Sequence, residues 1–436
     1  MMYRKSILNN GLRVVSHTMR ERDGVSLGIL VGAGGRSEPD QMKGAAHFLE
    51  HLLFKGSRKY SCQQIKENVE GVGGSLNAFT AEEQTCFYAK VPRRHFSKTF
   101  DVFADMIMGP AMKPADIRRE RGVILEEIKM YYDLPQYLVF ELMEKILWPG
   151  HPLGKGLAGT LESVAGLNGR KLRDFHRSHY VPNNMVVAVC GDIDHHSAVS
   201  LVRKKMGGMT FAPSPEWQPV IDDQKQPRVA VCRKPIEQTH IALGMPGLPA
   251  DDPARYALRL LNIVLGGNMS SRLFNELRER RGLAYSIGSG CKHLSDTGLF
   301  MIRAGLKTGK VQDALRLIMS ELKKVSRSGI TQAEFTRAKE YYIGQVLLGM
   351  EDSMEHMLWI GESTIVRDHI RTLDEVIRAI KQVRINDVKK AAAAVFDPSR
   401  YNLAVVGPLP DRQAQDLRAM FQGSVESVPE VAESVF

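Results

Sequence analysis

The stretch HFLEH, residues 47–51, decides how the fold and the chemistry of this chain are interpreted. The surrounding residues 44–54 are rich in alanine, leucine and phenylalanine and allow a helix. In a helix, His47 and His51 lie four residues apart on one face, so both imidazoles can bind the same metal ion. Glu50 borders that face without having to be a ligand. This arrangement predicts a hydrolytic zinc site, in which Zn²⁺ lowers the pKa of its water to about 7 and a carboxylate serves as the base.

The order HxxEH is a known zinc peptidase signature, but five residues are few enough to match by chance. The alternative interpretation is a helix with two half-buried histidines and a surface glutamate. A third ligand decides between the two interpretations. A zinc ion held by two neutral imidazoles needs an anionic oxygen or a thiolate as well, and a second helix can supply it from far along the chain.

Residues 114–128 predict that second helix, because Pro114 stands near its first turn and an acidic residue follows closely. Glu120 and Glu127 are seven residues apart, which places them on one face, two turns from each other. Glu126 is rotated away from that face by about 100°. Two carboxylates of this helix can therefore face the histidine pair.

HFLEH followed at this distance by ERGVILEE, residues 120–127, resembles the M16 family of metallopeptidases, which includes pitrilysin, insulin-degrading enzyme and the mitochondrial processing peptidase. In that family the third ligand follows the second histidine at the separation found here, 76 positions. The resemblance implies one Zn²⁺ per chain, with these ligands: His47, His51 and Glu127. It also implies that Glu50 is the catalytic base and that Glu120 orients a ligating histidine and raises its basicity.

Composition agrees with a soluble globular protein of two or more domains, since the chain has 436 residues, 43% of them hydrophobic and 25% charged. The formal net charge is +10, but lysine and arginine are spread along the chain without a basic block or an aromatic RNA-binding signature. We therefore expect no nucleic-acid partner. The five cysteines are widely spaced and form no CxxC pair, which argues against disulfides and favours a reducing compartment.

The amino-terminal residues contain no apolar signal region and lead directly into strand-like alternation. No run of about 20 apolar residues occurs in the chain, so the sequence supports neither export nor membrane spanning. We expect a cytoplasmic protein.

The second half of the chain repeats the pattern of the first, which predicts two similarly folded domains. The strand-like residues 185–192 have a counterpart in 401–408, and the helix with Glu127 has one at residues 332–346, where Gln345 takes the place of the carboxylate. Each half mixes hairpin-like strands with separate helices, so the predicted fold class is α+β. We expect these divisions: a zinc-binding domain at 1–211, a proline-rich linker at 212–228, a domain without metal ligands at 229–423 and a mobile tail at 424–436.

The segment NAFT, residues 77–80, is implicated in substrate binding by the resemblance. In similar enzymes this strand lies at the sheet edge beside the metal, and the substrate adds to it as a further strand. The implied substrate-binding residues are Asn77, Ala78 and Phe79. The alternative is that Phe79 is a core residue and Asn77 a turn residue.

The resemblance also covers residues 266–286, which are similar to bacterial processing-type members of the family. Their arginine and tyrosine, seven positions apart, match Arg278 and Tyr285, and a cation and a phenol aimed at a developing oxyanion are suitable catalytic donors. The alternative is a surface arginine and an ordinary strand residue. Family members of this length form half of a closed chamber, so we expect a homodimer in which each zinc domain is completed by Arg278 and Tyr285 of the partner subunit.

The predicted function is zinc-dependent endopeptidase activity on short unstructured peptides. Glu50 takes a proton from water, a peptide carbonyl is attacked, and Glu50 returns the proton to the leaving amine. Two alternatives remain at this point. One is a catalytically silent family member that binds peptides or assists assembly, and the other is a zinc ion that only braces the fold.

Overall fold

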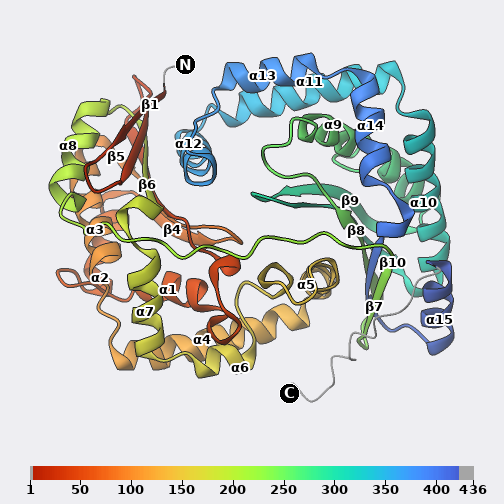
Figure 1. The fold of residues 1–436 in the computed structure, drawn as a ribbon, viewed down its shortest axis with the longest axis horizontal. Coiled ribbons are helices and arrows are strands. Elements are labelled where there is room, and N and C mark those ends of the chain that lie inside the picture. The colour runs from red at the N-terminus through yellow and green to blue at the C-terminus, as the bar shows by residue number, and fades with distance from the viewer. Residues whose placement is uncertain (1–2, 422–436) are drawn as a thin grey trace. The chain divides into compact units, whose positions relative to one another are not determined.

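Two β-sheets, each with its own layer of helices, organise residues 3–421, which are the residues that the computed structural model describes (Figure 1). They belong to two compact units, and each unit collects segments that are discontinuous in the sequence. The first unit contains 3–129, 155–218 and 346–376, and the second contains the other described residues. The α+β class predicted from the sequence is confirmed. The expected tail at 424–436 lies outside the described residues.

The first unit is built on a six-stranded sheet in the order β1-β2-β6-β3-β5-β4, in which only the β2–β6 pair is parallel. Its strands are β1 (Tyr3–Ile7), β2 (Arg13–Thr18), β3 (Gly24–Val31), β4 (Ser75–Thr80), β5 (Thr85–Pro92) and β6 (Met185–Gly191). β3 and β6 are buried almost throughout because helices cover both faces of the sheet. Leu30 packs against one helical layer, and β4 is left as an edge strand.

The helices of the first unit position the candidate site. They are α1 (Ala45–Leu53), α2 (Cys62–Val69), α3 (Phe96–Met108), α4 (Pro114–Asp133), α6 (Leu161–Gly166), α7 (Gly169–His179), α8 (His195–Met206) and α12 (Ser353–Arg367). The last residues of α4 belong to the second unit. Ser61 caps α2 through a capping box with Gln64, which explains why that helix begins where it does.

The second unit has a five-stranded sheet in the order β7-β11-β8-β10-β9, in which only β7 and β11 pair in parallel. Its strands are β7 (Arg228–Arg233), β8 (Gln238–Pro246), β9 (Ala284–His293), β10 (Gly298–Lys307) and β11 (Asn402–Gly407). Its helices are α5 (Pro135–Leu147), α9 (Arg255–Leu265), the π-helix η7 (Phe274–Arg280), α10 (Val311–Ser328), α11 (Gln332–Gly349), α13 (Leu373–Gln382), α14 (Ile385–Val395) and α15 (Asp411–Met420). Parts of α11 and α13 belong to the first unit.

The internal repeat is visible in the strand pairing. The order β2-β6-β3-β5-β4 corresponds strand by strand to β7-β11-β8-β10-β9, with the same parallel and antiparallel partners. Helix α9 follows β8 as α1 follows β3, but α9 is the apolar segment RYALRLLNIVL and carries no histidine. The two sheets therefore share one topology, which explains why the sequence indicates two similar domains.

One pair of helices is exchanged between the two halves of the sequence. Helix α5 comes from the first half but packs on β8 and β11, where Leu142 and Met143 join the core around Ala242. Helix α12 comes from the second half but packs on β3 and β6, where Met357 and Ile360 enter the core. The domains expected from the sequence, which end at 211 and begin at 229, are contiguous and therefore do not show this exchange. An amphipathic pattern shows that a helix covers a sheet but does not show which sheet it covers.

None of the described helices is long and apolar enough to cross a bilayer.

An ion pair in the second unit fastens the segment before η7 to α11. The Nε and Nη2 atoms of Arg272 each donate to a carboxylate oxygen of Glu334 at 2.7 Å, and the backbone of Thr331 also donates to Glu334. These donors, Arg272 above all, lower the pKa of Glu334 to about 2. The folded state therefore favours the ionised carboxylate.

We predict that Glu334→Gln lowers the free energy of unfolding by about 2 kcal/mol at neutral pH, the range for hydrogen bonds to a charged group. Because the folded pKa lies below the unfolded value of about 4.3, this stabilisation is fully present above that value and is lost as the pH falls toward 2. Urea unfolding between pH 7 and pH 3 measures the difference. Glu340→Gln, at an exposed position of the same helix, is the control. A difference that stays constant down to pH 3 would contradict the prediction.

Candidate metal centre

Helix α1 carries the HFLEH residues and presents one face to the interior of the first unit. Its alanine, phenylalanine and leucine side chains are all buried: Ala45, Ala46, Phe48, Leu49, Leu52 and Leu53. His47, Glu50 and His51 lie on the remaining face and are half-buried. The burial of the apolar face fixes the direction of the polar one, so the two imidazoles and the carboxylate share one small region.

The three predicted ligands converge on one point. The rings of His47 and His51 have centroids 4.8 Å apart. An Oε2 atom of Glu127 on α4 lies 3.8 Å from Nε2 of His47 and 3.6 Å from Nε2 of His51. One ligand atom from each of these three residues lies within 4.8 Å of the other two. Among the described residues, this is the group of histidine, cysteine, aspartate or glutamate side chains that could hold a metal ion.

Burial and the neighbouring His51 lower the pKa of His47 to about 4. His47 is therefore neutral at pH 7, which is the form that binds a metal. Its Nδ1 atom is buried and has no hydrogen-bond partner among the described residues.

Glu120 and Lys55 hold the second histidine in place. The ring Nδ1 of His51 lies 3.3 Å from Oε2 of Glu120, which is 2% exposed. A proton on Nδ1 satisfies that carboxylate and leaves Nε2 free toward Glu127. The buried charge of Glu120 is balanced by Lys55, whose Nζ lies 2.9 Å from Oε1. Glu120 therefore lies against one of the two histidines.

Glu50 faces the same region and is held by the edge strand. Burial raises the pKa of Glu50, while a hydrogen bond from the Thr80 hydroxyl, at 2.6 Å to Oε2, opposes this effect. The carboxylate is therefore oriented by β4 and remains able to change its protonation state. A carboxylate of this kind suits proton transfer to and from a reacting group.

A glycine directly precedes helix α1, and the Glu38 carboxylate caps the start of the helix. Gly44 has a left-handed backbone with φ of 90°, and a side chain there would collide with the Ala158 carbonyl. The Glu38 carboxylate accepts from the backbone nitrogen of Gly44 at 2.9 Å and from that of Ala46 at 2.6 Å. Lys43 balances the buried charge, with its Nζ 3.5 Å from Oε2 of Glu38. This pair fixes the start of the helix that carries the histidines.

The predicted substrate residues lie on the edge strand β4, which contacts α1. Asn77 is exposed, and its Oδ1 accepts from the backbone nitrogen of Ala78 at 2.9 Å. Phe79 is half-buried and lies 6.1 Å from the ring of Tyr88 on β5. The strand therefore keeps one side unpaired next to Glu50 and the histidines.

Arg278 and Tyr285 belong to the second unit. Arg278 lies in the π-helix η7, where its guanidinium sits 4.9 Å from the centre of the Phe274 ring and is half exposed. Tyr285 stands at the start of β9, the edge strand of its sheet, and is 77% exposed. Both side chains are free to meet another molecule.

The sequence does not single out four residues that hold the site in place: Thr80, Lys55, Glu38 and Lys43. The sequence does contain one indication of a capping residue outside the helix. Gly44 has no side chain, so it cannot accept hydrogen bonds from the first backbone nitrogens of α1. Lys55 stands four residues after His51, so helical spacing places it near the same face. Nothing in the sequence separates Thr80 from an ordinary strand residue.

Two family patterns match this chain. The one described as "Insulinase (Peptidase family M16)" matches residues 13–161, which include all three candidate ligands. The one described as "Peptidase M16 inactive domain" matches residues 166–342, which include none of them.

Similar sequences span nearly the whole chain. An uncharacterized zinc protease of Streptomyces coelicolor is 39% identical over 95% of this chain and 91% of its own length. Uncharacterized zinc proteases of Mycobacterium tuberculosis and Bacillus subtilis are 36% and 35% identical, covering 96% and 93% of this chain and 96% and 98% of their own.

Solved structures share the fold at low identity. A protease from Helicobacter pylori superimposes with a TM-score of 0.89 at 23% identity, over 93% of this chain and 99% of its own. A structure titled as a peptidase M16 inactive domain, from Pseudomonas fluorescens, gives 0.87 at 21%, over 94% of this chain and 98% of its own.

We predict that Glu38→Gln lowers the free energy of unfolding by about 3 kcal/mol, because the amide removes the negative charge beside the buried Lys43 ammonium and sets an N–H group against a backbone donor. Urea unfolding of the purified chain measures the loss. The control is Asp40→Asn, which removes an exposed charge from the same segment and should change stability by less than about 0.5 kcal/mol. Equal stability of Glu38→Gln and the parent chain would show that the cap is dispensable.

Proposed function

Since the chain belongs to the M16 family of metallopeptidases, we propose that it is a zinc-dependent endopeptidase that hydrolyses short, unstructured peptides. The observation that carries this proposal is the convergence of His47, His51 and Glu127 within 4.8 Å, next to the Glu50 carboxylate. Relatives that match nearly the whole chain are named zinc proteases, which supports the same activity.

The residues present fit a zinc ion. Two imidazole nitrogens and one carboxylate oxygen form the donor set of many catalytic zinc sites, which keep one further position open. The hydrogen bond between His51 and Glu120 selects the tautomer that offers Nε2. We propose one Zn²⁺ per chain at this position. Zinc bound there would supply Lewis acidity, which polarises a peptide carbonyl and acidifies a water molecule.

Glu50 is the proposed general base and acid. Its carboxylate accepts a proton from water as the peptide carbonyl is attacked, and returns that proton to the leaving amine. The Thr80 hydroxyl holds one carboxylate oxygen, so the other is left to meet the water. Burial raises the pKa of Glu50, which makes its carboxylate a stronger acceptor for the proton of the water.

The edge strand β4 is the proposed substrate-binding element. An extended peptide can add to the unpaired side of this strand through backbone hydrogen bonds. The Ala78 N–H, which donates to Oδ1 of Asn77, would then exchange that side chain for a substrate carbonyl. Asn77 and Phe79 flank that position and would contact neighbouring substrate residues. Because such pairing needs a free strand, unfolded peptides are the expected substrates and folded proteins are excluded.

The second candidate is a catalytically silent member of the family. This alternative is suggested by the family pattern described as an inactive domain, which matches residues 166–342. That range contains no candidate ligand, whereas the insulinase pattern covers the range that does. The complete set of His47, His51, Glu127 and Glu50 therefore favours an active enzyme.

We predict that Glu50→Gln retains one equivalent of zinc and lowers the turnover of a fluorogenic peptide by about 10³-fold, the scale of a lost general base. Zinc is measured by atomic absorption on the same sample. Glu126→Gln is the matched control, because Glu126 is an exposed glutamate on α4 that pairs with Lys129. Turnover within tenfold of the parent enzyme in Glu50→Gln would remove Glu50 as the base, and absence of turnover in the parent itself would favour the silent alternative.

We further propose that the enzyme is a homodimer in which each metal centre is completed by Arg278 and Tyr285 of the partner subunit. The exposure of Tyr285 and the half exposure of Arg278 support this assignment, since neither side chain is used within its own unit's core. A guanidinium and a phenol can stabilise the charge that develops on the substrate carbonyl.

Co-expression of two inactive variants tests the shared site. In a mixed dimer of Glu50→Gln with the double variant Arg278→Ala, Tyr285→Phe, one of the two sites keeps all its residues. Random assortment makes half of the dimers mixed, so activity should recover to about a quarter of the parent value for a two-fold symmetric dimer. Each variant expressed alone should stay inactive. No recovery in the mixed sample, or a monomer by analytical ultracentrifugation, would contradict the proposal.

A further inference from the structure

A buried arginine joins three segments of the first unit. Arg36 lies in the short helical turn η1 (Gly35–Ser37), and none of its side chain is exposed. Its Nη1 atom donates to Oε1 of Glu83 at 2.7 Å, while Nη2 and Nε donate to the Gln218 carbonyl at 2.9 Å and 3.3 Å. The Trp217 ring covers the guanidinium, with its centre 3.7 Å away. We call these four residues the Arg36 clamp.

The clamp fastens the turn of the β4–β5 hairpin, residues 81–84, which carries the carboxylate of the clamp. The backbone nitrogens of Gly35 and Arg36 donate to two carbonyls of this turn at 3.1 Å and 2.7 Å. Gly34 approaches the turn so closely that an added Cβ atom would lie 2.2 Å from the Ala81 oxygen. Side-chain and backbone contacts therefore hold the turn against the segment that precedes α1.

The position of this turn bears on the proposed base. Strand β4 ends at Thr80, directly before the turn, and the Thr80 hydroxyl donates to Oε2 of Glu50 at 2.6 Å. Arg36 also stands two residues before Glu38, whose carboxylate caps the start of α1. One short segment thus holds both the strand that carries the hydroxyl and the helix that carries the base. A movement of the turn would change the distance between them.

The chemistry of the clamp requires an arginine. A guanidinium is planar and carries five N–H donors, so it can bind a carboxylate and a carbonyl in different directions while its face stacks on an aromatic ring. A lysine ammonium is a compact charge that cannot make this set of contacts. Strand β4 needs such support because β5 is the one strand that it pairs with, and an isolated two-stranded hairpin is marginally stable.

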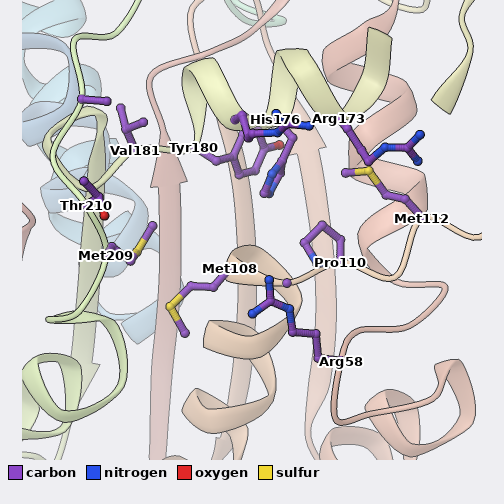
Figure 2. A pocket seen from close by; sticks show the side chains of 13 residues that line it. Arg58, Met108, Pro110, Met112, Arg173, His176, Tyr180, Val181, Met209 and Thr210 are labelled. Carbon is purple, nitrogen blue, oxygen red and sulfur yellow. The ribbon is translucent and has the colours of Figure 1, made fainter. Parts of the chain in front are cut away.

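Another role for a buried arginine is to hold an anionic ligand in a cavity. Figure 2 shows a cavity of about 500 Å³ in the first unit, which is lined by residues of α7, the end of α3 and the segment after α8. Arg36 does not line this cavity, and its guanidinium donates to Glu83 and Gln218 instead. The contacts of Arg36 therefore favour a role within the protein over one in ligand binding.

We propose that Arg36 is a positioning residue for peptide hydrolysis, which holds β4 at the place where Thr80 orients the Glu50 carboxylate. This inference rests on the proposed function, and it gives Arg36 no contact with the substrate or the metal centre. Loss of the clamp lets the hairpin turn move, so Glu50 is aligned in a smaller fraction of the molecules. Turnover then falls while the zinc content stays the same.

A double-mutant cycle tests whether Arg36 acts through Thr80. The turnover of a fluorogenic peptide is measured for the parent, Arg36→Lys, Thr80→Val and the double variant, with zinc determined on each sample. We expect Arg36→Lys to lower kcat about tenfold in the parent but by less than about twofold in the Thr80→Val background, because the two residues act in one path. A merely structural effect would lower kcat by the same factor in both backgrounds.

Hydrogen exchange followed by mass spectrometry gives a second measurement that needs no activity. The amides of Gly35 and Arg36, which donate to the turn, should exchange at least about tenfold faster in Arg36→Lys, whereas those of the buried strand β6 should not change. Arg93→Lys is the matched control, because Arg93 is an exposed arginine after the other end of the hairpin and pairs with Asp192.

Trp217→Leu provides a variant that keeps all the charges of the clamp. Trp217 is 37% exposed, so its loss leaves the core intact. It should lower kcat in the same direction as Arg36→Lys, and again only when Thr80 is present. Thermal unfolding shows whether each variant is folded, and Trp217→Leu replaces Arg36→Lys in the cycle if the latter does not fold.

Three results would overturn the assignment. Equal losses of kcat in the two Thr80 backgrounds would show that Arg36 does not act through that hydroxyl. Unchanged exchange at the turn contacts in both clamp variants would show that the clamp does not hold the hairpin. A parent chain without turnover would remove the proposed function and this role of Arg36 with it. Faster exchange in Arg36→Lys would in that case identify the clamp as a purely structural device.

Discussion

Two imidazoles and two carboxylates share one half-buried space between α1 and α4, and the rest of the first unit is arranged to keep them there. His47, His51, Glu120 and Glu127 all lie within hydrogen-bond or ion-pair range of at least one other member. Carboxylates are costly to bury without a cation, and the neutral imidazole of His47 supplies none. Lys55 balances Glu120. The ligand atoms of the three remaining groups lie within 4.8 Å of one another, an arrangement that could hold a metal ion.

Maintaining that arrangement needs a rigid helix α1. Its apolar face is wholly buried, and its first backbone nitrogens are bound by Glu38, a carboxylate from outside the helix. On the opposite side, Thr80 ties Glu50 to the edge strand. The element proposed to bind the substrate therefore also orients the proposed base, so peptide binding and proton transfer are linked through one hydroxyl group.

Much of this could be predicted from the sequence, for identifiable reasons. Helical spacing alone places His47 and His51 on one face, and the buried leucines of α1 favour that helix. The role of Glu127 as a ligand was predicted from the resemblance to the M16 family, since no local pattern connects residues 76 positions apart. Glu38 and Thr80 could not be assigned, because their roles depend on which segments meet in space. The exchange of α5 and α12 was missed for the same reason. An amphipathic helix shows that it covers something, but not which sheet it covers.

The pseudo-repeat explains how one chain carries two kinds of site. Both halves use the same strand order, yet the helix after β3 holds HFLEH, whereas the equivalent helix after β8 is RYALRLLNIVL and carries neither a histidine nor a carboxylate. The first half can thus be specialised for a metal, while the second half presents Arg278 and Tyr285 on its own surface elements.

X-ray absorption at the zinc edge of the purified chain tests the central claim most directly. The account predicts about one zinc ion per chain, with two imidazole nitrogens at about 2.0–2.1 Å, further oxygen at similar distance and no sulfur. The Glu127→Ala variant should lose one oxygen contribution or the ion itself. Sulfur scattering at about 2.3 Å, or a zinc signal unchanged by loss of Glu127, would contradict the claim that His47, His51 and Glu127 share one ion.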